Sequence, residues 1–117
     1  MLKSPHQIFS EPQFLQENPE AIARWGPLLK LEPLDRQVVF QQALSGAFHN
    51  TSTRLDQVQK ETLVVTGDSD RLIHMKNSHL IAEKIPNSRL VVLPGVGHEL
   101  PSQAGPQMVQ LLQEFCL

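Results

Sequence analysis

Two short apolar runs decide the fold: Thr62-Leu63-Val64-Val65-Thr66, which ends at Gly67, and Arg89-Leu90-Val91-Val92-Leu93, which ends at Pro94-Gly95. Neither run alternates polar with apolar residues, and this is the pattern of strands covered on both faces, as in a parallel sheet. Between the runs, Asn77 to Ile85 carries apolar residues at helical spacing. A strand, a helix and a strand over about thirty residues predict a βαβ unit. Residues 106–117 are predicted to form a closing amphipathic helix.

The first half of the chain has a sequence pattern typical of helices. Asn18-Pro19-Glu20 is typical of a helix start, because proline suits the first helical position, where no amide donor is needed. A second helix is expected from about Pro33 to Phe48. We therefore predict an α/β protein with two parts: a helical segment over residues 1–60 and a βαβα portion over residues 61–117.

The composition bears on whether the protein binds nucleic acid, associates with membranes or is exported. The 117 residues carry a formal net charge of −2, without the concentrated excess of Lys and Arg that a phosphate-binding surface needs. No apolar run approaches the ~20 residues of a membrane span, and the N-terminus lacks the apolar core of a signal peptide. The single cysteine, Cys116, has no internal disulfide partner and is predicted to lie on a packed helix face. We expect a cytoplasmic protein that binds neither nucleic acid nor membranes.

Chemistry-bearing residues follow both predicted strands. Asp70 lies in the loop after the first strand, and His98 lies in the loop after the second. Because parallel strands bring such loops to the same edge of a sheet, we expect the two side chains to approach hydrogen-bonding distance. A carboxylate beside a histidine holds the imidazole tautomer and stabilises its charged form. Asp70 and His98 are therefore candidate catalytic residues.

These loops resemble those of the α/β-hydrolase family, of the serine-hydrolase type. Residues 62–70 are similar to the penultimate core strand with the G-x-x-D loop that bears the acid of the catalytic triad. Residues 89–98 are similar to the last core strand with the G-x-G-H loop that bears the triad histidine. The helical residues 11–48 occupy the place of the lid in chain order. The resemblance spans most of the chain, is strongest over 54–117, and implies the C-terminal portion of that fold.

The chain departs from the family pattern at the nucleophile, because no G-x-S-x-G elbow occurs in the sequence. Ser45 in Ala43-Leu44-Ser45-Gly46-Ala47 has no glycine two residues before or after it and lies in a helical pattern. Ser69 follows Gly67 at the right distance but belongs to the acid loop. Asp68 is the alternative to Asp70 as the acid, since it lies nearer the strand.

Other polar residues indicate less. His74 and His79 lie near a helix start, but no Cys or carboxylate cluster completes a metal-ligand set. Glu99 follows His98 and either tunes it or lies solvated at the rim. The resemblance implies neither a metal nor a cofactor.

The resemblance implies hydrolysis of an ester, lactone or similar acyl compound by a Ser-His-Asp mechanism, although other members of the fold cleave carbon–carbon or carbon–halogen bonds. Without the nucleophile, we expect this chain to be inactive by itself. Three readings stay open: a fragment of a hydrolase, one part of a split hydrolase whose missing N-terminal part supplies the serine, or a non-catalytic association module. Self-association is a further expectation.

Overall fold

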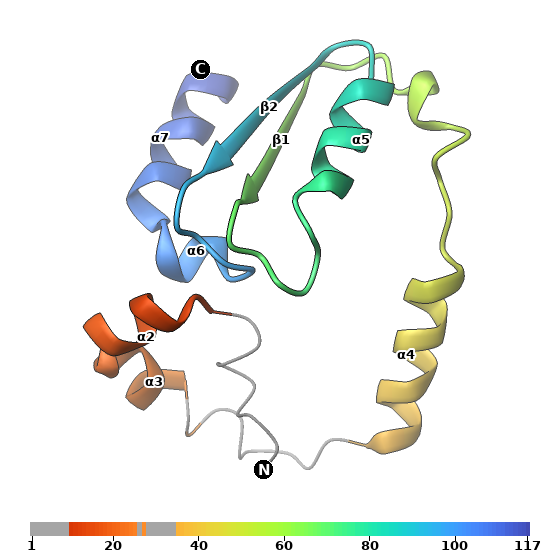
Figure 1. Cartoon of the computed structure of the whole chain (residues 1–117). Coiled ribbons are helices and arrows are strands. Elements are labelled where there is room, and N and C mark those ends of the chain that lie inside the picture. The colour runs from red at the N-terminus through yellow and green to blue at the C-terminus, as the bar shows by residue number, and fades with distance from the viewer. Residues whose placement is uncertain (1–9, 26, 28–34) are drawn as a thin grey trace.

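The computed structural model of the protein describes residues 10–25, 27 and 35–117 (Figure 1). Its elements, in chain order, are α2 (Pro12–Glu17), α3 (Pro19–Trp25), α4 (Arg36–Phe48), the short 3₁₀ helix η2 (Leu55–Gln57), β1 (Thr62–Gly67), α5 (Lys76–Lys84), β2 (Ser88–Leu93), α6 (Leu100–Gln103) and α7 (Gly105–Cys116). The chain thus has the mixed α/β architecture that the sequence predicts, with helices first and the strands in the second half.

The two strands form the predicted βαβ unit. β1 pairs with β2 in parallel, and the register runs without offset from Thr62 opposite Ser88 to Gly67 opposite Leu93. α5 connects the strands and packs against both of them. The parallel pairing predicted from the two apolar runs is confirmed, with each strand one residue longer than expected.

Helices lie on both sides of this strand pair. Figure 1 shows α5 on one side and α7 on the other. The core on the α7 side is a cluster of Leu93, Val96 and Ala104, with partly buried side chains of the strands and of α6 and α7 packed around it. Ile85, just after α5, is also buried. The strands therefore carry a small core from which their two following loops project.

Burial of the strands is lower than their apolar sequences predict. Most residues of β1 and β2 are half-buried, and among the described residues no large side chain is fully buried. The reason is the width of the described sheet, because two strands give each other only one neighbour. Thr62 and Asp68 donate their backbone N–H groups toward β2. By the alternation of a parallel ladder, the N–H and C=O groups of Leu63 and Val65 then point to the outer edge of β1.

Helices α2 and α4 begin after acidic residues, Glu11 and Asp35, whose carboxylates cap them. α3 begins at Pro19, as the sequence predicts. α4 begins after Asp35, whose carboxylate accepts from the backbone N–H groups of Gln37 and Val38. The start expected near Pro33 lies outside the described residues. Every residue of α4 is exposed, including five large apolar side chains: Val38, Val39, Phe40, Leu44 and Phe48. The predicted division near residue 60 stays a prediction.

The closing helix differs from the prediction in two respects. A short helix, α6, precedes α7, and Cys116 is exposed where the sequence predicted a packed face. Met108 and Leu111 face the core, and Cys116 falls five residues after Leu111, which turns it away from that face. Across the described parts of the chain, no helix combines the length and the hydropathy that crossing a bilayer requires.

We expect the purified chain to associate in solution, because the outer edge of β1 and the apolar side chains of α4 lack cover among the described residues. Light scattering at micromolar concentration should give a mass above the monomer, together with a broad thermal transition. The double variant Phe40→Gln/Phe48→Gln separates the two surfaces, since association through β1 survives it. A monomeric mass with a sharp cooperative melt would contradict this expectation.

Candidate functional site: an acid–histidine pair at the carboxyl edge

The loops that follow β1 and β2 are bonded to each other at the carboxyl edge of the strand pair. The backbone N–H of Asp68 donates to the carbonyl of Leu93 at 3.1 Å, which continues the ladder one residue past β1. The N–H of Ser69 donates to the carbonyl of Val96 at 3.1 Å. The N–H of Gly95 donates back to Oδ1 of Asp68 at 2.8 Å. Three hydrogen bonds therefore fix one loop against the other.

Two glycines permit this contact. A Cβ on Gly67 would lie 1.9 Å from the backbone oxygen of Val96, so no larger residue fits there without a shift of the loop. Gly95 has a φ of +69°, a left-handed conformation that costs other residues energy. The turn at Gly95 directs the chain of the second loop back over Gly67 and toward Asp70.

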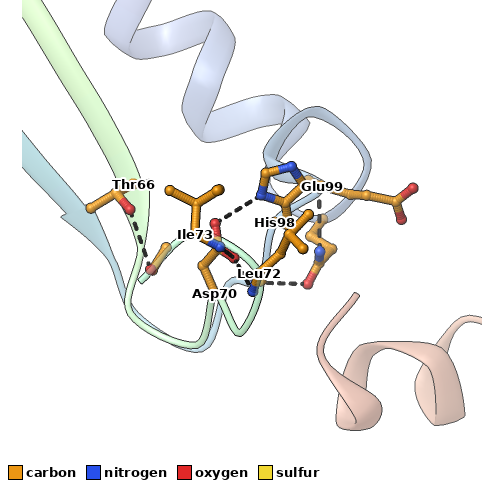
Figure 2. Close-up of polar contacts among 9 residues, drawn as sticks. Thr66, Asp70, Leu72, Ile73, His98 and Glu99 are labelled. Atoms are coloured by element: carbon orange, nitrogen blue, oxygen red, sulfur yellow. Dashed lines mark hydrogen bonds and ion pairs between the residues drawn. The ribbon is translucent and has the colours of Figure 1, made fainter. Parts of the chain in front are cut away.

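Asp70 and His98 meet across these loops, as Figure 2 shows. Nδ1 of His98 lies 2.9 Å from Oδ2 of Asp70. The other carboxylate oxygen, Oδ1, accepts from the backbone N–H groups of Leu72 and Ile73, each at 2.9 Å. The Asp70 side chain is buried, with 5% of its surface exposed, whereas that of His98 is 36% exposed. The prediction that the two side chains reach hydrogen-bonding distance is confirmed, and their catalytic role remains a prediction.

The electrostatics of Asp70 favour its ionised form. Burial raises the pKa of the Asp70 carboxyl, but the hydrogen bonds from His98, Ile73 and Leu72 outweigh burial and hold the pKa below its ordinary value of 3.8. An ionised carboxylate accepts hydrogen bonds and donates none, so the proton between the two groups belongs to Nδ1 of His98. The lone pair of the neutral imidazole is then on Nε2. This is the tautomer that a general base requires when its Nδ1 faces an orienting carboxylate.

The alternative acid and the alternative nucleophile lie in the same loop with other partners. Asp68 accepts at Oδ1 from the hydroxyl of Ser69, at 2.9 Å, in addition to the N–H of Gly95. Asp68 therefore links the two loops through its bond with Gly95. The carboxylate hydrogen-bonded to Nδ1 of His98 is that of Asp70. Ser45 lies within α4, as its helical sequence pattern predicts.

The remaining polar candidates lie outside the pair. His74 accepts at Nδ1 from the N–H of Lys76 at 3.2 Å, next to the start of α5, and His79 is exposed on that helix. Glu99 extends away from Asp70 (Figure 2), and its carboxylate accepts from the hydroxyl of Ser10. Glu99 is therefore not a fully solvated rim charge, and a tuning effect on His98 stays a prediction. Within residues 10–25, 27 and 35–117, no group of three or more His, Cys, Asp or Glu side chains is placed to hold a metal ion.

Sequence reasoning missed three contributors to this site. The amides of Leu72 and Ile73 complete the surroundings of Asp70, and an aspartate ending a strand is itself a signal for such bonds to amides two and three residues on. Gln103 accepts at Oε1 from the N–H of Gly97, the residue before His98, at 3.1 Å. No local pattern indicates that contact.

No family model and no curated protein matches this sequence. The fold, however, is similar to several solved structures. Est816, an N-acyl homoserine lactone degrading enzyme, has 26% sequence identity and a TM-score of 0.75. A thermophilic esterase from Thermogutta terrifontis has 25% identity and a TM-score of 0.76. MGS-M2, an alpha/beta hydrolase from a Medee basin deep-sea metagenome library, has 23% identity and a TM-score of 0.76, which bears on the fold alone.

These matches cover nearly all of this chain but less than half of each neighbour. They include 93% of this chain and 44% of Est816, 94% and 40% for the Thermogutta esterase, and 94% and 41% for MGS-M2. The described fold thus corresponds to a part of a larger architecture.

Gly67→Ala should loosen the contact between the two loops, because its Cβ overlaps the backbone of Val96. We expect the free energy of opening of the Ser69 amide, measured by hydrogen exchange, to fall by about 1–3 kcal/mol. Gly105→Ala is the matched control, since a Cβ there meets nothing within 4 Å. Equal exchange at Ser69 in both variants would refute the close approach.

Asp70→Asn should lower the opening free energy of the Leu72 and Ile73 amides by about 1.5–3 kcal/mol near neutral pH, because both lose a charged acceptor. The folded pKa of Asp70 lies below its unfolded value, so its contribution is fully present above the unfolded pKa and is lost as the pH falls through the folded pKa. Hydrogen exchange followed on acidification should show wild type and variant converging. Asp56→Asn, in η2, is the control, and a difference between Asp70→Asn and wild type that is independent of pH would contradict this assignment.

Proposed function

We propose that this chain, which belongs to the α/β-hydrolase fold family, supplies the acid–histidine part of a serine hydrolase that acts on an ester, lactone or similar acyl compound. The observation that carries the proposal is the 2.9 Å contact between Asp70 and His98. Asp70 is the orienting acid and His98 is the general base and acid. The serine nucleophile lies outside this sequence, which has no G-x-S-x-G elbow.

The proposed reaction divides acyl transfer into two steps. His98 takes the proton of the serine hydroxyl at Nε2 while the serine oxygen attacks the acyl carbon, and then gives that proton to the leaving alcohol. Water, deprotonated in the same way by His98, attacks the acyl-serine. The bond between the acyl carbon and the serine oxygen then breaks, His98 returns the proton to that oxygen, and the carboxylic acid leaves. Asp70 stays ionised throughout and stabilises the imidazolium, in keeping with its lowered pKa. Backbone amides outside this chain would stabilise the oxyanion.

The class of substrate rests on the neighbours of at least 25% identity. One degrades N-acyl homoserine lactones and the other is an esterase. Esters and lactones share an acyl–oxygen bond, which supports this class of substrate. Because this chain spans about two fifths of each of them, the activity of the assembled protein is part of the proposal.

The outer edge of β1 is the proposed place of the serine-bearing part. Backbone groups of Leu63 and Val65 point toward that edge, and a further parallel strand would satisfy them. Such a strand would also widen the cover over the half-buried residues of β1. This favours an assembled hydrolase, in which the serine arrives beside β1, over a non-catalytic association module.

Complementation tests the proposed function. The part of the Thermogutta terrifontis esterase that this chain does not match is produced as a separate polypeptide and mixed with this chain, and hydrolysis of p-nitrophenyl butyrate is followed. We expect turnover that depends on both polypeptides and that Asp70→Asn and His98→Ala reduce by a factor of about 10² or more. Asp56→Asn in this chain is the control and should retain the full rate. A complex that forms without turnover, or turnover that survives His98→Ala, would contradict the proposal.

This chain alone should not hydrolyse the same ester above background, because its sequence has no G-x-S-x-G elbow and the proposal places the amides of the oxyanion site outside it. The measurement is the steady-state rate of the purified chain against that of Ser69→Ala. Turnover that withstands further purification and disappears in Ser69→Ala would identify Ser69 as a nucleophile and overturn the division of roles.

A further inference from the structure

A polar network joins the entry of α2 to the loop that carries His98. The side chain of Gln103, at the end of α6, accepts at Oε1 from the N–H of Gly97 at 3.1 Å and from the N–H of Glu11 at 3.2 Å. Its Nε2 donates to the carbonyl of Glu99 at 3.4 Å. Gly97 and Glu99 flank His98, so Gln103 contacts the loop on both sides of the imidazole-bearing residue. Glu11 is distant in sequence but adjacent here.

Ser10 adds a second link between the same two segments. Its hydroxyl donates to the carboxylate of Glu99, and Ser10 is buried, with 5% of its surface exposed. Glu11 in turn caps α2, because its carboxylate accepts from the N–H groups of Gln13 and Phe14. The attachment point is therefore Ser10 and Glu11, directly before α2, and α2 lies beside α6 in Figure 1.

Glutamine suits this position for a chemical reason. Two backbone N–H groups donate to Oε1 of Gln103, and its Nε2 donates to a backbone carbonyl. The position therefore needs an acceptor and a donor on one planar group. A carboxylate would serve both N–H groups without the donor, and an apolar side chain would leave the buried N–H of Gly97 without its bond.

We propose that Gln103 is a positioning residue that couples the N-terminal helical segment to His98. Docking of Ser10 and Glu11 on the histidine loop fixes Gly97 and Glu99, and these hold the imidazole with Nδ1 toward Asp70. The helical segment that occupies the place of the lid thereby controls the orientation and tautomer of His98, the proposed general base. This inference rests on the proposed function, because it assigns a purpose to the position of His98, but its test requires no turnover.

The test uses the whole chain labelled with ¹⁵N. Gln103→Met keeps the length of the side chain and removes its polar atoms. Gln103→Glu keeps the acceptor for the amides of Gly97 and Glu11. Gln107→Met, at an exposed position of α7, is the matched control. Hydrogen exchange is measured at Gly97 and Glu11, and the ring ¹⁵N shifts of His98 give the fraction protonated at Nδ1. Gln103→Met should speed exchange at both amides about tenfold and lower the Nδ1–H fraction. Gln103→Glu should keep exchange slow at both amides, because it retains their acceptor, and Gln107→Met should change neither readout.

Two results would overturn the proposal. One is a His98 tautomer in Gln103→Met equal to that of wild type although Gly97 and Glu11 exchange faster, which would leave Gln103 a structural residue. The other is exchange at Gly97 and Glu11 that stays at the wild-type rate in Gln103→Met. Should Gln103→Met not fold, Ser10→Ala approaches the network from the other segment, and an unchanged His98 tautomer there would overturn the coupling. Failure of ester turnover in the complementation assay would refute the proposed function and leave these readouts standing.

Discussion

The parallel pairing of β1 and β2 without offset is the constraint on which the site depends. Gly67 lies opposite Leu93, so the two strands end at paired positions of the ladder. The loops that follow therefore begin side by side at the carboxyl edge. The next hydrogen bonds, from Asp68 to Leu93 and from Ser69 to Val96, extend the ladder into those loops. A shift of one residue in this register would move Asp70 by about 3.3 Å relative to His98 and break their contact. The absence of a side chain at Gly67 is what lets the loops approach closely enough.

Local sequence signals were sufficient for the strands and for the pair. An apolar run that ends at glycine predicts a buried strand and its loop, and two such runs around a helical segment predict a parallel unit. Sequence distance could not choose between Asp68 and Asp70 as the acid. The structure separates them by hydrogen bonding, because Asp68 braces Gly95 whereas Asp70 receives two amides and the imidazole.

The burial of the strands and the network around Gln103 could not be predicted, for different physical reasons. An apolar sequence predicts that a strand is suited to burial, but the extent of burial depends on the neighbouring elements that are present. β1 and β2 have few such neighbours and are half-buried. Gln103 and Ser10 act through contacts between segments about ninety residues apart in sequence, and hydrogen bonds of that kind depend on how helices dock. Docking of this kind has no periodic signature. The docking nevertheless accompanies the contacts of Gln103 with the N–H of Gly97 and the carbonyl of Glu99, on either side of His98.

This chain by itself holds Asp70 and His98 in hydrogen-bonding contact, before any nucleophile is supplied. Proton NMR of the far-downfield region tests it most directly, because a Nδ1 proton held between an imidazole and a buried carboxylate exchanges slowly enough to be observed. The account predicts a resonance that correlates with Nδ1 of His98, disappears in Asp70→Asn and persists in Ser69→Ala. A wild-type spectrum without that resonance, with His98 protonated at Nε2, would contradict the account.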